Sequence, residues 1–305
     1  MAIQEFNPAN VMLSEKKDGS FTPEMTGTVM KEVRDHSLVM RLGKYEEMNG
    51  RQEKKFSFQT DGVSAYWVDE GQKIQTSKPG FAEATMRAKK LGVIILASRE
   101  YLNYTWAQFF NEMKDDIAEA FYKKFDQAAI LNKDNPFDFS VDQVAKKIEG
   151  PITFDNVLAL EDVIYDEGGT VEAFVSNNRN HSTLRQAVNA QGESIYDRQT
   201  RQIDGITTVH YDDLGKGVIY AGDWTKNLIY GVPYNITFKI SEDAQISTIK
   251  NSDGTPVNLY EQELIALRAT MDVAFMTLKD EAFAKLEAPG AETGETEEEE
   301  TAGES

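Results

Sequence analysis

The feature that most constrains the fold is an alternating strand followed closely by a long amphipathic helix, between residues 70 and 126. Residues 83–98 alternate and then become a continuous apolar run, which predicts a strand buried on both faces. Thr105 and Gln108 form a capping box, which predicts that a helix begins there. Apolar residues then recur at three- and four-residue steps along about seven helical turns: Trp106, Phe109, Phe110, Met113, Ile117, Ala120, Phe121, Phe125 and Ala128.

A hairpin arm is predicted before this strand. Residues 55–60 alternate, Asp61 and Gly62 are a two-residue turn signal, and residues 63–68 alternate again. A two-stranded ribbon is marginally stable alone, so its apolar face needs a surface to lie on. That surface is the domain's own core, the default interpretation, or a neighbouring subunit. The apolar side chains of the arm are Phe56, Phe58, Tyr66 and Trp67.

The middle of the chain predicts an inserted domain with a mixed sheet. A capping box at Ser140 opens a short helix to Ile148, and Thr153 opens another that two glycines end. Asn177 can cap a helix to Val188. Strands are expected between these helices and after them, and such alternation predicts a sheet with flanking helices. The expected strands are residues 171–175, 206–211 and 217–221.

Later segments return to a clear two-residue period, at residues 234–240 and 265–275. We expect these strands to pair with residues 83–98 and to form a sheet under the long helix. Near the amino terminus, Thr22 and Pro23 are a good helix start. The inward residues of that helix would be Met25, Val29 and Val33.

Composition excludes some classes of function. The chain has 305 residues and no Cys, which excludes disulfides and thiolate chemistry. A formal charge of −19 argues against a surface that neutralises nucleic-acid phosphates. A charge of this sign also favours solubility. The tail, residues 290–305, holds seven Glu and no basic residue, so we expect it to be disordered.

The sequence offers little catalytic chemistry. None of the three histidines has a ligand partner at helical spacing, so we expect no metal, no cofactor and no catalytic residue. His181 is expected on a helix surface. An acid pair, Glu261 and Glu263, would share one strand face, which is a poor geometry for flanking a substrate. A soluble carbohydrate-active or sugar-binding protein therefore stays a distant alternative.

Several short motifs in a specific order resemble the major capsid proteins of tailed bacteriophages with the Hong Kong 97 fold, especially those of staphylococcal and related Gram-positive siphophages. In that family a glycine and a polar residue close an extended loop, a strand ends near Ser-x-Glu, and Asp-x-Ala ends a long spine helix. Residues 178–192 and 253–269 resemble later parts of the family, whereas residues 132–136 lack its frequent Gly-rich turn. The matching motifs are Gly71-Gln72, Lys89-Lys90-Leu91, Ser98-Arg99-Glu100 and Asp126-Gln127-Ala128.

The resemblance implies an α+β fold divided into recognisable parts. These are an amino-terminal arm and helix (1–48), an extended hairpin loop (49–82), a peripheral domain with the spine helix (83–150 and 233–280), an axial domain (151–232), a return segment (281–289) and the acidic tail (290–305). The tips of the axial domain would include residues 192–202.

The resemblance also implies a structural function. The chain would form pentamers and hexamers that close an icosahedral head around double-stranded DNA, without binding its sequence, and would reside in the virion after assembly in the host cytoplasm. A separate scaffolding protein and a portal would be partners, and a membrane would not. An encapsulin-type compartment that loads a cargo enzyme is the alternative. The expected inter-subunit contacts are Lys54, Lys55, Phe56, Phe58, Tyr66, Trp67, Arg87, Lys89, Lys90, Arg99 and Glu100.

Overall fold

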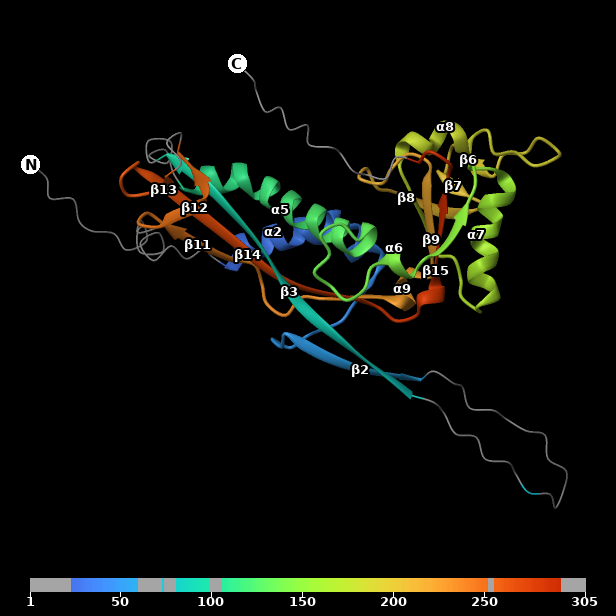
Figure 1. The fold of residues 1–305 in the computed structure, drawn as a ribbon, viewed down its shortest axis with the longest axis horizontal. Helices are drawn as coiled ribbons and strands as arrows, with labels where there is room; N and C mark the ends of the chain where they lie inside the picture. The colour runs from blue at the N-terminus through green and yellow to red at the C-terminus, as the bar shows by residue number, and fades with distance from the viewer. Residues whose placement is uncertain (1–22, 60–72, 74–80, 99–105, 252–254, 292–305) are drawn as a thin grey trace, which may run out of the picture.

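Two β-sheets organise the chain and lie one after the other along its longest axis (Figure 1). The computed structural model describes residues 23–59, 73, 81–98, 106–251 and 255–291. A six-stranded sheet has the order β1-β10-β14-β3-β2, with β11 also paired to β14. A seven-stranded sheet has the order β4-β15-β9-β5-β8-β7-β6, and β12 and β13 form a separate pair.

The described elements have the following bounds. The six-stranded sheet contains β1 (Lys44–Tyr45), β2 (Glu53–Gln59), β3 (Phe81–Ser98), β10 (Leu228–Gly231), β11 (Thr237–Ser241) and β14 (Leu264–Thr277). The seven-stranded sheet contains β4 (Lys146–Glu149), β5 (Ala173–Ser176), β6 (Tyr196–Asp197), β7 (Gln202–Ile203), β8 (Ile206–His210), β9 (Val218–Gly222) and β15 (Phe283–Glu287). The remaining strands and the helices are β12 (Gln245–Lys250), β13 (Pro256–Asn258), α2 (Pro23–His36), α3 (Leu38–Leu42), α5 (Trp106–Leu131), α6 (Val141–Val144), α7 (Phe154–Asp166), η2 (Asn178–Asn180), α8 (His181–Leu184), α9 (Trp224–Asn227) and η3 (Asp280–Ala282).

The predicted pairing of residues 265–275 with residues 83–98 is confirmed, whereas that of residues 234–240 was wrong, because β11 pairs with β14 instead of β3. β14 runs antiparallel to β3, and the register extends from Leu264 opposite Ser98 to Ala274 opposite Ala88. The prediction that the apolar run of β3 is buried on both faces was wrong, because Ile94 is 47% exposed. Alternate residues of the run, such as Val93 and Ile95, pack into the main core with α5. One face of the strand is therefore covered by the helix, and the other stays open at Ile94.

The long helix α5 begins at Trp106 as predicted and ends at Leu131. Its predicted stripe is buried at Ile117, Phe121, Phe125 and Ala128. Ala120 is exposed, so that part of the predicted stripe was wrong. The stripe shifts because Ala118, Ala129 and Ile130 are buried instead, where α2 and α3 pack on the helix.

Asp126 joins the long helix to α3. Its carboxylate accepts hydrogen bonds from Ser37 Oγ at 2.7 Å, Leu38 N at 2.7 Å and Val39 N at 3.1 Å. Ser37 is also the N-cap of α3, because its Oγ accepts from Met40 N at 3.2 Å. Burial raises the pKa of Asp126 to about 7, although these three donors favour the ionised form. The side chain thus supplies the acceptors that the start of a short helix lacks.

The seven-stranded sheet confirms the predicted mixed sheet with flanking helices. β5 pairs with β8 in parallel and with β9 in antiparallel orientation. Thr153 caps α7, whose residues Val157, Leu160 and Ile164 are buried against one face. The other face contributes Val175 and other residues to the main core that α5 shares, so the two sheets meet in one apolar interior.

Two strands belong to a different sheet from the one that their neighbours in sequence would suggest. β4, which follows the long helix, pairs with β15 in the seven-stranded sheet. β10, at the end of the inserted segment, pairs with β14 in the six-stranded sheet. The chain therefore crosses between the two sheets near residues 146, 228 and 280.

Three local predictions were wrong. The helix from Ser140 ends at Val144 instead of Ile148, because residues 146–149 pair with β15 as a strand. Asn177 does cap a helical turn, but helix ends at Leu184 because Val188 bridges to Ser194. Glu261 and Glu263 do not share a strand face: both lie in the turn before β14, where Glu263 has a φ of 50°.

Candidate assembly surfaces

β3 belongs to the six-stranded sheet and also to a projecting arm. Its residues from Ala88 onward pair with β14, and those from Phe81 to Arg87 pair with β2. In Figure 1 this β2–β3 ribbon points away from the other strands of the six-stranded sheet. Because one continuous strand runs through both parts, the direction of the ribbon is set by the sheet. We call the ribbon formed by β2 and residues 81–87 the arm. The predicted pairing partner of β2, residues 63–68, lies outside the described residues.

The base of the arm is fastened to its own subunit. Phe56 is half-buried and packs against a cluster that includes Met48 and Met86. Lys54 Nζ contacts Glu46 Oε1 and the Glu47 carbonyl, each at 2.6 Å, and lies 5.5 Å from the centre of the Phe56 ring. These contacts give Lys54 and Phe56 a role in holding the arm.

Other predicted contact residues lie along the same strands. Arg87 Nε is 3.2 Å from Glu53 Oε1, on the paired strand, and both side chains are largely exposed. Lys55 and Lys90 are exposed and Lys89 is half-buried, and none of the three forms an ion pair with another described residue. Phe58 lies on β2, although its side chain is outside the description. Tyr66, Trp67, Arg99 and Glu100 also lie outside the described residues.

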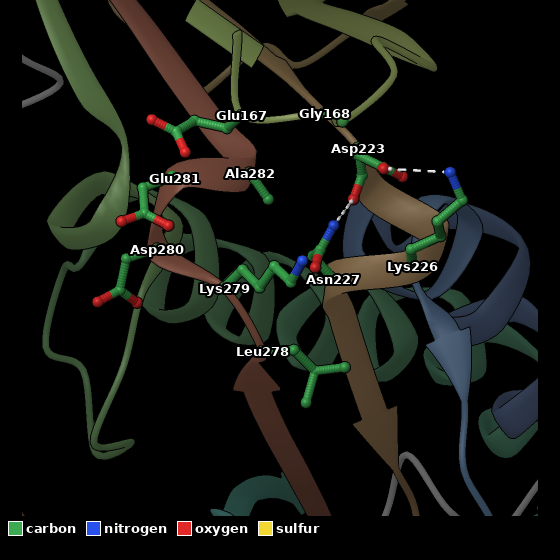
Figure 2. A pocket seen from close by; sticks show the side chains of 11 residues that line it. Glu167, Gly168, Asp223, Lys226, Asn227, Leu278, Lys279, Asp280, Glu281 and Ala282 are labelled. Carbon is green, nitrogen blue, oxygen red and sulfur yellow. Dashed lines mark hydrogen bonds and ion pairs between the residues drawn. The ribbon is translucent and has the colours of Figure 1, made fainter. Parts of the chain in front are cut away.

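A cavity of about 660 Å³ lies where the chain crosses between the sheets (Figure 2). Asp223 is buried beside it, with Oδ2 3.3 Å from Lys226 Nζ, and its Oδ1 has no hydrogen-bond partner in the described chain. The lining comes from three separate segments, so no sequence motif indicated it. It holds carboxylates and ammonium groups without a hydroxyl, thiol or imidazole. The lining residues are Glu167, Gly168, Gly169, Asp223, Lys226, Asn227, Leu278, Lys279, Asp280, Glu281 and Ala282.

The structure corrects the prediction for His181. Its ring faces that of His210, with 4.8 Å between the centroids, and its Nε2 is buried rather than on a helix surface. Within the described residues, no group of three or more His, Cys, Asp or Glu side chains is arranged to hold a metal ion. Of the described helices, none is both long enough and apolar enough to cross a membrane.

Comparison with known proteins shows which family the chain belongs to. Residues 21–288 match the model of the phage capsid family. The chain belongs to the phage capsid family. This capsid protein is 52% identical over 291 residues to the major capsid protein of Staphylococcus phage 80alpha, covering 93% of this chain and 89% of that one. It is 24% identical to the probable major capsid protein of Mycobacterium phage L5, covering 88% of this chain and 89% of that one.

Solved structures agree on the fold. A chain from Microbacterium phage Oxtober96 matches with a TM-score of 0.69 at 18% identity, covering 83% of this capsid protein and 91% of that chain. The capsid of an empty GTA particle matches with a TM-score of 0.63 at 13% identity, covering 82% and 89%. The predicted family, the capsid function and the location in the virion are confirmed, and neither alternative function is favoured.

Proposed function

We propose that this capsid protein is the main shell subunit of an icosahedral head, assembled as pentamers and hexamers around double-stranded DNA. The observation that carries the proposal is the arm, which leaves the body of its own subunit. Past Phe56, residues such as Ser57 and Glu83 are exposed. Because a two-stranded ribbon is marginal in water, it gains stability by lying on a second copy of the chain.

In Hong Kong 97 terms, the six-stranded sheet with α5 is the peripheral domain and the seven-stranded sheet is the axial domain. Residues 192–202, around β6 and β7, would then approach the five-fold and six-fold axes. Sheet membership suggests two changes to the boundaries expected from the sequence. β4 and β15 would join the axial domain, and β10 the peripheral one.

The electrostatics suit a container rather than a reader of DNA. With a formal charge of −19, the chain gives DNA little electrostatic reason to adhere, so contact with the packaged genome would be independent of sequence. A separate scaffolding protein and a portal would act as assembly partners. The subunit needs no cofactor and no catalytic residue, because its function is carried by buried contact area between copies.

Within the arm, we assign separate roles to base and tip. The Lys54–Glu46 pair would fasten the base of the arm to its own subunit, and the Arg87–Glu53 pair would join its two strands. Lys55, Lys89 and Lys90 would be available for charge pairs with the neighbour, together with the predicted contacts Arg99 and Glu100. Exposed pairs of this kind contribute about 0–1 kcal/mol each, so apolar residues of the loop would supply most of the binding.

Shortening the arm tests this function. Ser57 lies opposite Glu83 in the ribbon, so replacing residues 58–82 with an Asn-Gly turn should close the hairpin without disturbing its base. We expect a subunit with an unchanged thermal unfolding midpoint that forms no closed shells when it is co-expressed with its scaffolding protein. Negative-stain electron microscopy and light scattering measure the shells.

The matched control is Asp162→Asn, an exposed change on α7, which should assemble normally. Closed shells of normal diameter from the shortened chain would show that the arm is not needed for assembly. A shortened chain whose folding is impaired would show a lower unfolding midpoint or no cooperative transition. This result would separate a folding defect from an assembly defect.

A further inference from the structure

Two histidines that are distant in the sequence lie ring against ring, tilted by 40°, where α8 meets the end of β8. His181 is the first residue of α8, and His210 is the last residue of β8. Their ring centroids are 4.8 Å apart, and the ring of Tyr196, on β6, lies 5.3 Å from that of His181. His181 Nε2 and both ring nitrogens of His210 are buried and have no hydrogen-bond partner among the described residues.

The surrounding backbone fixes the position of both rings. Asn180, next to His181, is buried and donates to the Val218 carbonyl at 2.9 Å, and its Oδ1 accepts from Gly217 N at 2.8 Å. His210 is held by the pairing of β8 with β5. These contacts fix the backbone positions that carry the two half-buried rings.

The hairpin of β6 and β7 covers this pair. β7 pairs with β8 through Gln202 opposite Thr207 and Ile203 opposite Ile206, and β6 carries Tyr196 against His181. Tyr196 Oη lies 3.4 Å from His181 Nδ1. If the hairpin separates from β8, the His181 ring loses its cover and becomes accessible to water.

The charges that face the pair are mostly positive. Arg185, after α8, and Arg201, in the hairpin turn, both oppose a proton on His181, and Arg201 also opposes one on His210. The backbone of Ser176, through a hydrogen bond, and the charge of Asp212, after β8, both favour the protonated ring of His210 and so raise its pKa. The hairpin's Asp197 is engaged within its own turn, where it accepts from Gln199 N and Thr200 Oγ1, each at 2.8 Å.

His210 also borders a second set of charges. It lines a cavity of about 170 Å³ between α2, α5 and the segment after β8. The titratable and charged residues that share this cavity are His36, Arg41, Tyr122, Lys123, Asp126, Tyr211, Asp212 and Asp213.

We propose that the His181–His210 pair makes the hairpin of β6 and β7 acid-labile, so that mild acid loosens this tip of the sheet while the rest of the subunit stays folded. Protonation of either ring would place a positive charge in a half-buried space against the other ring and Arg201, at ring nitrogens that are themselves buried. The closed hairpin solvates that charge less well than the opened hairpin.

The direction of the pH dependence follows from linkage. Burial, followed by the neighbouring positive charges, lowers the pKa of both His181 and His210 below the ordinary value of 6.5. The open hairpin, with ordinary pKa values, therefore takes up protons first as the pH falls. The contribution of the two histidines to the free energy of hairpin closing is fully present above about pH 6.5. This contribution is lost as the pH falls below that value. The pKa of Asp126 is raised, so a lower pH stabilises the folded subunit through this residue. The pH dependence of global stability would mix the two opposite effects, so it is not a suitable measure.

Hydrogen exchange of the full-length subunit at pH 7.5 and pH 5.5 tests the proposal without any substitution. After correction for intrinsic exchange rates, we expect protection of residues 195–207 to fall about tenfold at pH 5.5, the effect of roughly one proton per pH unit. Protection of α5 should not fall, because the raised pKa of Asp126 favours the folded state at the lower pH. Equal protection of the hairpin at both pH values would overturn the proposal.

Substitutions then identify the groups responsible. The double variant His181→Gln with His210→Gln removes both titrating rings, and its hairpin protection should be independent of pH. The control Asp115→Asn changes an exposed carboxylate on α5, leaves the three histidines in place and should leave the wild-type pH response intact. A double variant that keeps the tenfold response would assign it to other groups and reject the histidine pair.

Discussion

Asp126 connects two separate helices through three buried hydrogen bonds. It lies on α5, yet its three partners, Ser37, Leu38 and Val39, all belong to the start of α3. A helix of five residues has little stability of its own. The amino-terminal segment therefore folds against the long helix because one carboxylate replaces the backbone acceptors that its first turn lacks.

Replacing this residue should be costly. In Asp126→Ala, two backbone N–H groups and one hydroxyl would be left buried without acceptors, so we expect a loss of about 3 kcal/mol in the free energy of unfolding. Urea unfolding of the unassembled subunit measures the loss.

The control for this change is Asp115→Ala, an exposed position on the same helix, which should alter stability by less than about 0.5 kcal/mol. Equal effects of the two substitutions would mean that water replaces the carboxylate of Asp126 and that α3 does not depend on it.

At the scale of elements, β3 shows how one strand serves two structures. Its inner half is part of a sheet that α5 covers, and its outer half forms the arm with β2. Met86 lies close to the point where the partner changes, is fully buried, and packs with Met48 and Ile229. This small cluster, together with the half-buried Phe56, supports the arm where it leaves the sheet.

Met86→Ala should therefore loosen the arm at its base. Removing a fully buried methionine costs about 2–4 kcal/mol, and we expect faster hydrogen exchange in residues 53–57 as well as a lower unfolding midpoint. Ile94→Ala, on the exposed face of the same strand, is the control and should cost less than about 1 kcal/mol. A Met86→Ala variant whose arm exchanges at the wild-type rate would show that the support comes from elsewhere.

The elements that sequence predicted well are those whose pattern is long and local. α5 and the β3–β14 pair extend over many residues with a steady period, so their existence followed from the sequence. β4 did not, because residues 146–149 become a strand only through pairing with β15, more than a hundred positions away. The burial of His181 and the cavity beside Asp223 likewise depend on contacts between distant segments, which no local pattern encodes. The arm contacts at Lys55, Lys89 and Lys90 stay predictions.

At the scale of the whole molecule, each sheet is completed by a late segment. β15 lies between β4 and β9, so it supplies hydrogen bonds on both edges of an interior position. Its residues Phe283, Ala284 and Leu286 are fully buried. The seven-stranded sheet should therefore be unable to form without it.

Two truncations separate this strand from the tail. A chain ending at Asp280 should lose cooperative unfolding of the seven-stranded sheet, because β4 loses its partner β15 and β9 keeps β5 on one side alone. A chain ending at Ala291 keeps β15 and should retain its stability to within about 1 kcal/mol. Differential scanning calorimetry measures both, and similar traces from the two chains would show that β15 is dispensable.

The interior positions of β14 and β15 also set the timing of folding during synthesis. β14 lies between β10 and β3, and β15 lies between β4 and β9. Neither sheet can therefore be completed before the residues after 260 have been synthesised. Contacts between segments so far apart in sequence form slowly and late. A chain released early would expose unpaired strand edges in place of a finished surface. Synthesis through β15 is therefore a condition for entering the shell, because a shorter chain lacks the finished surface.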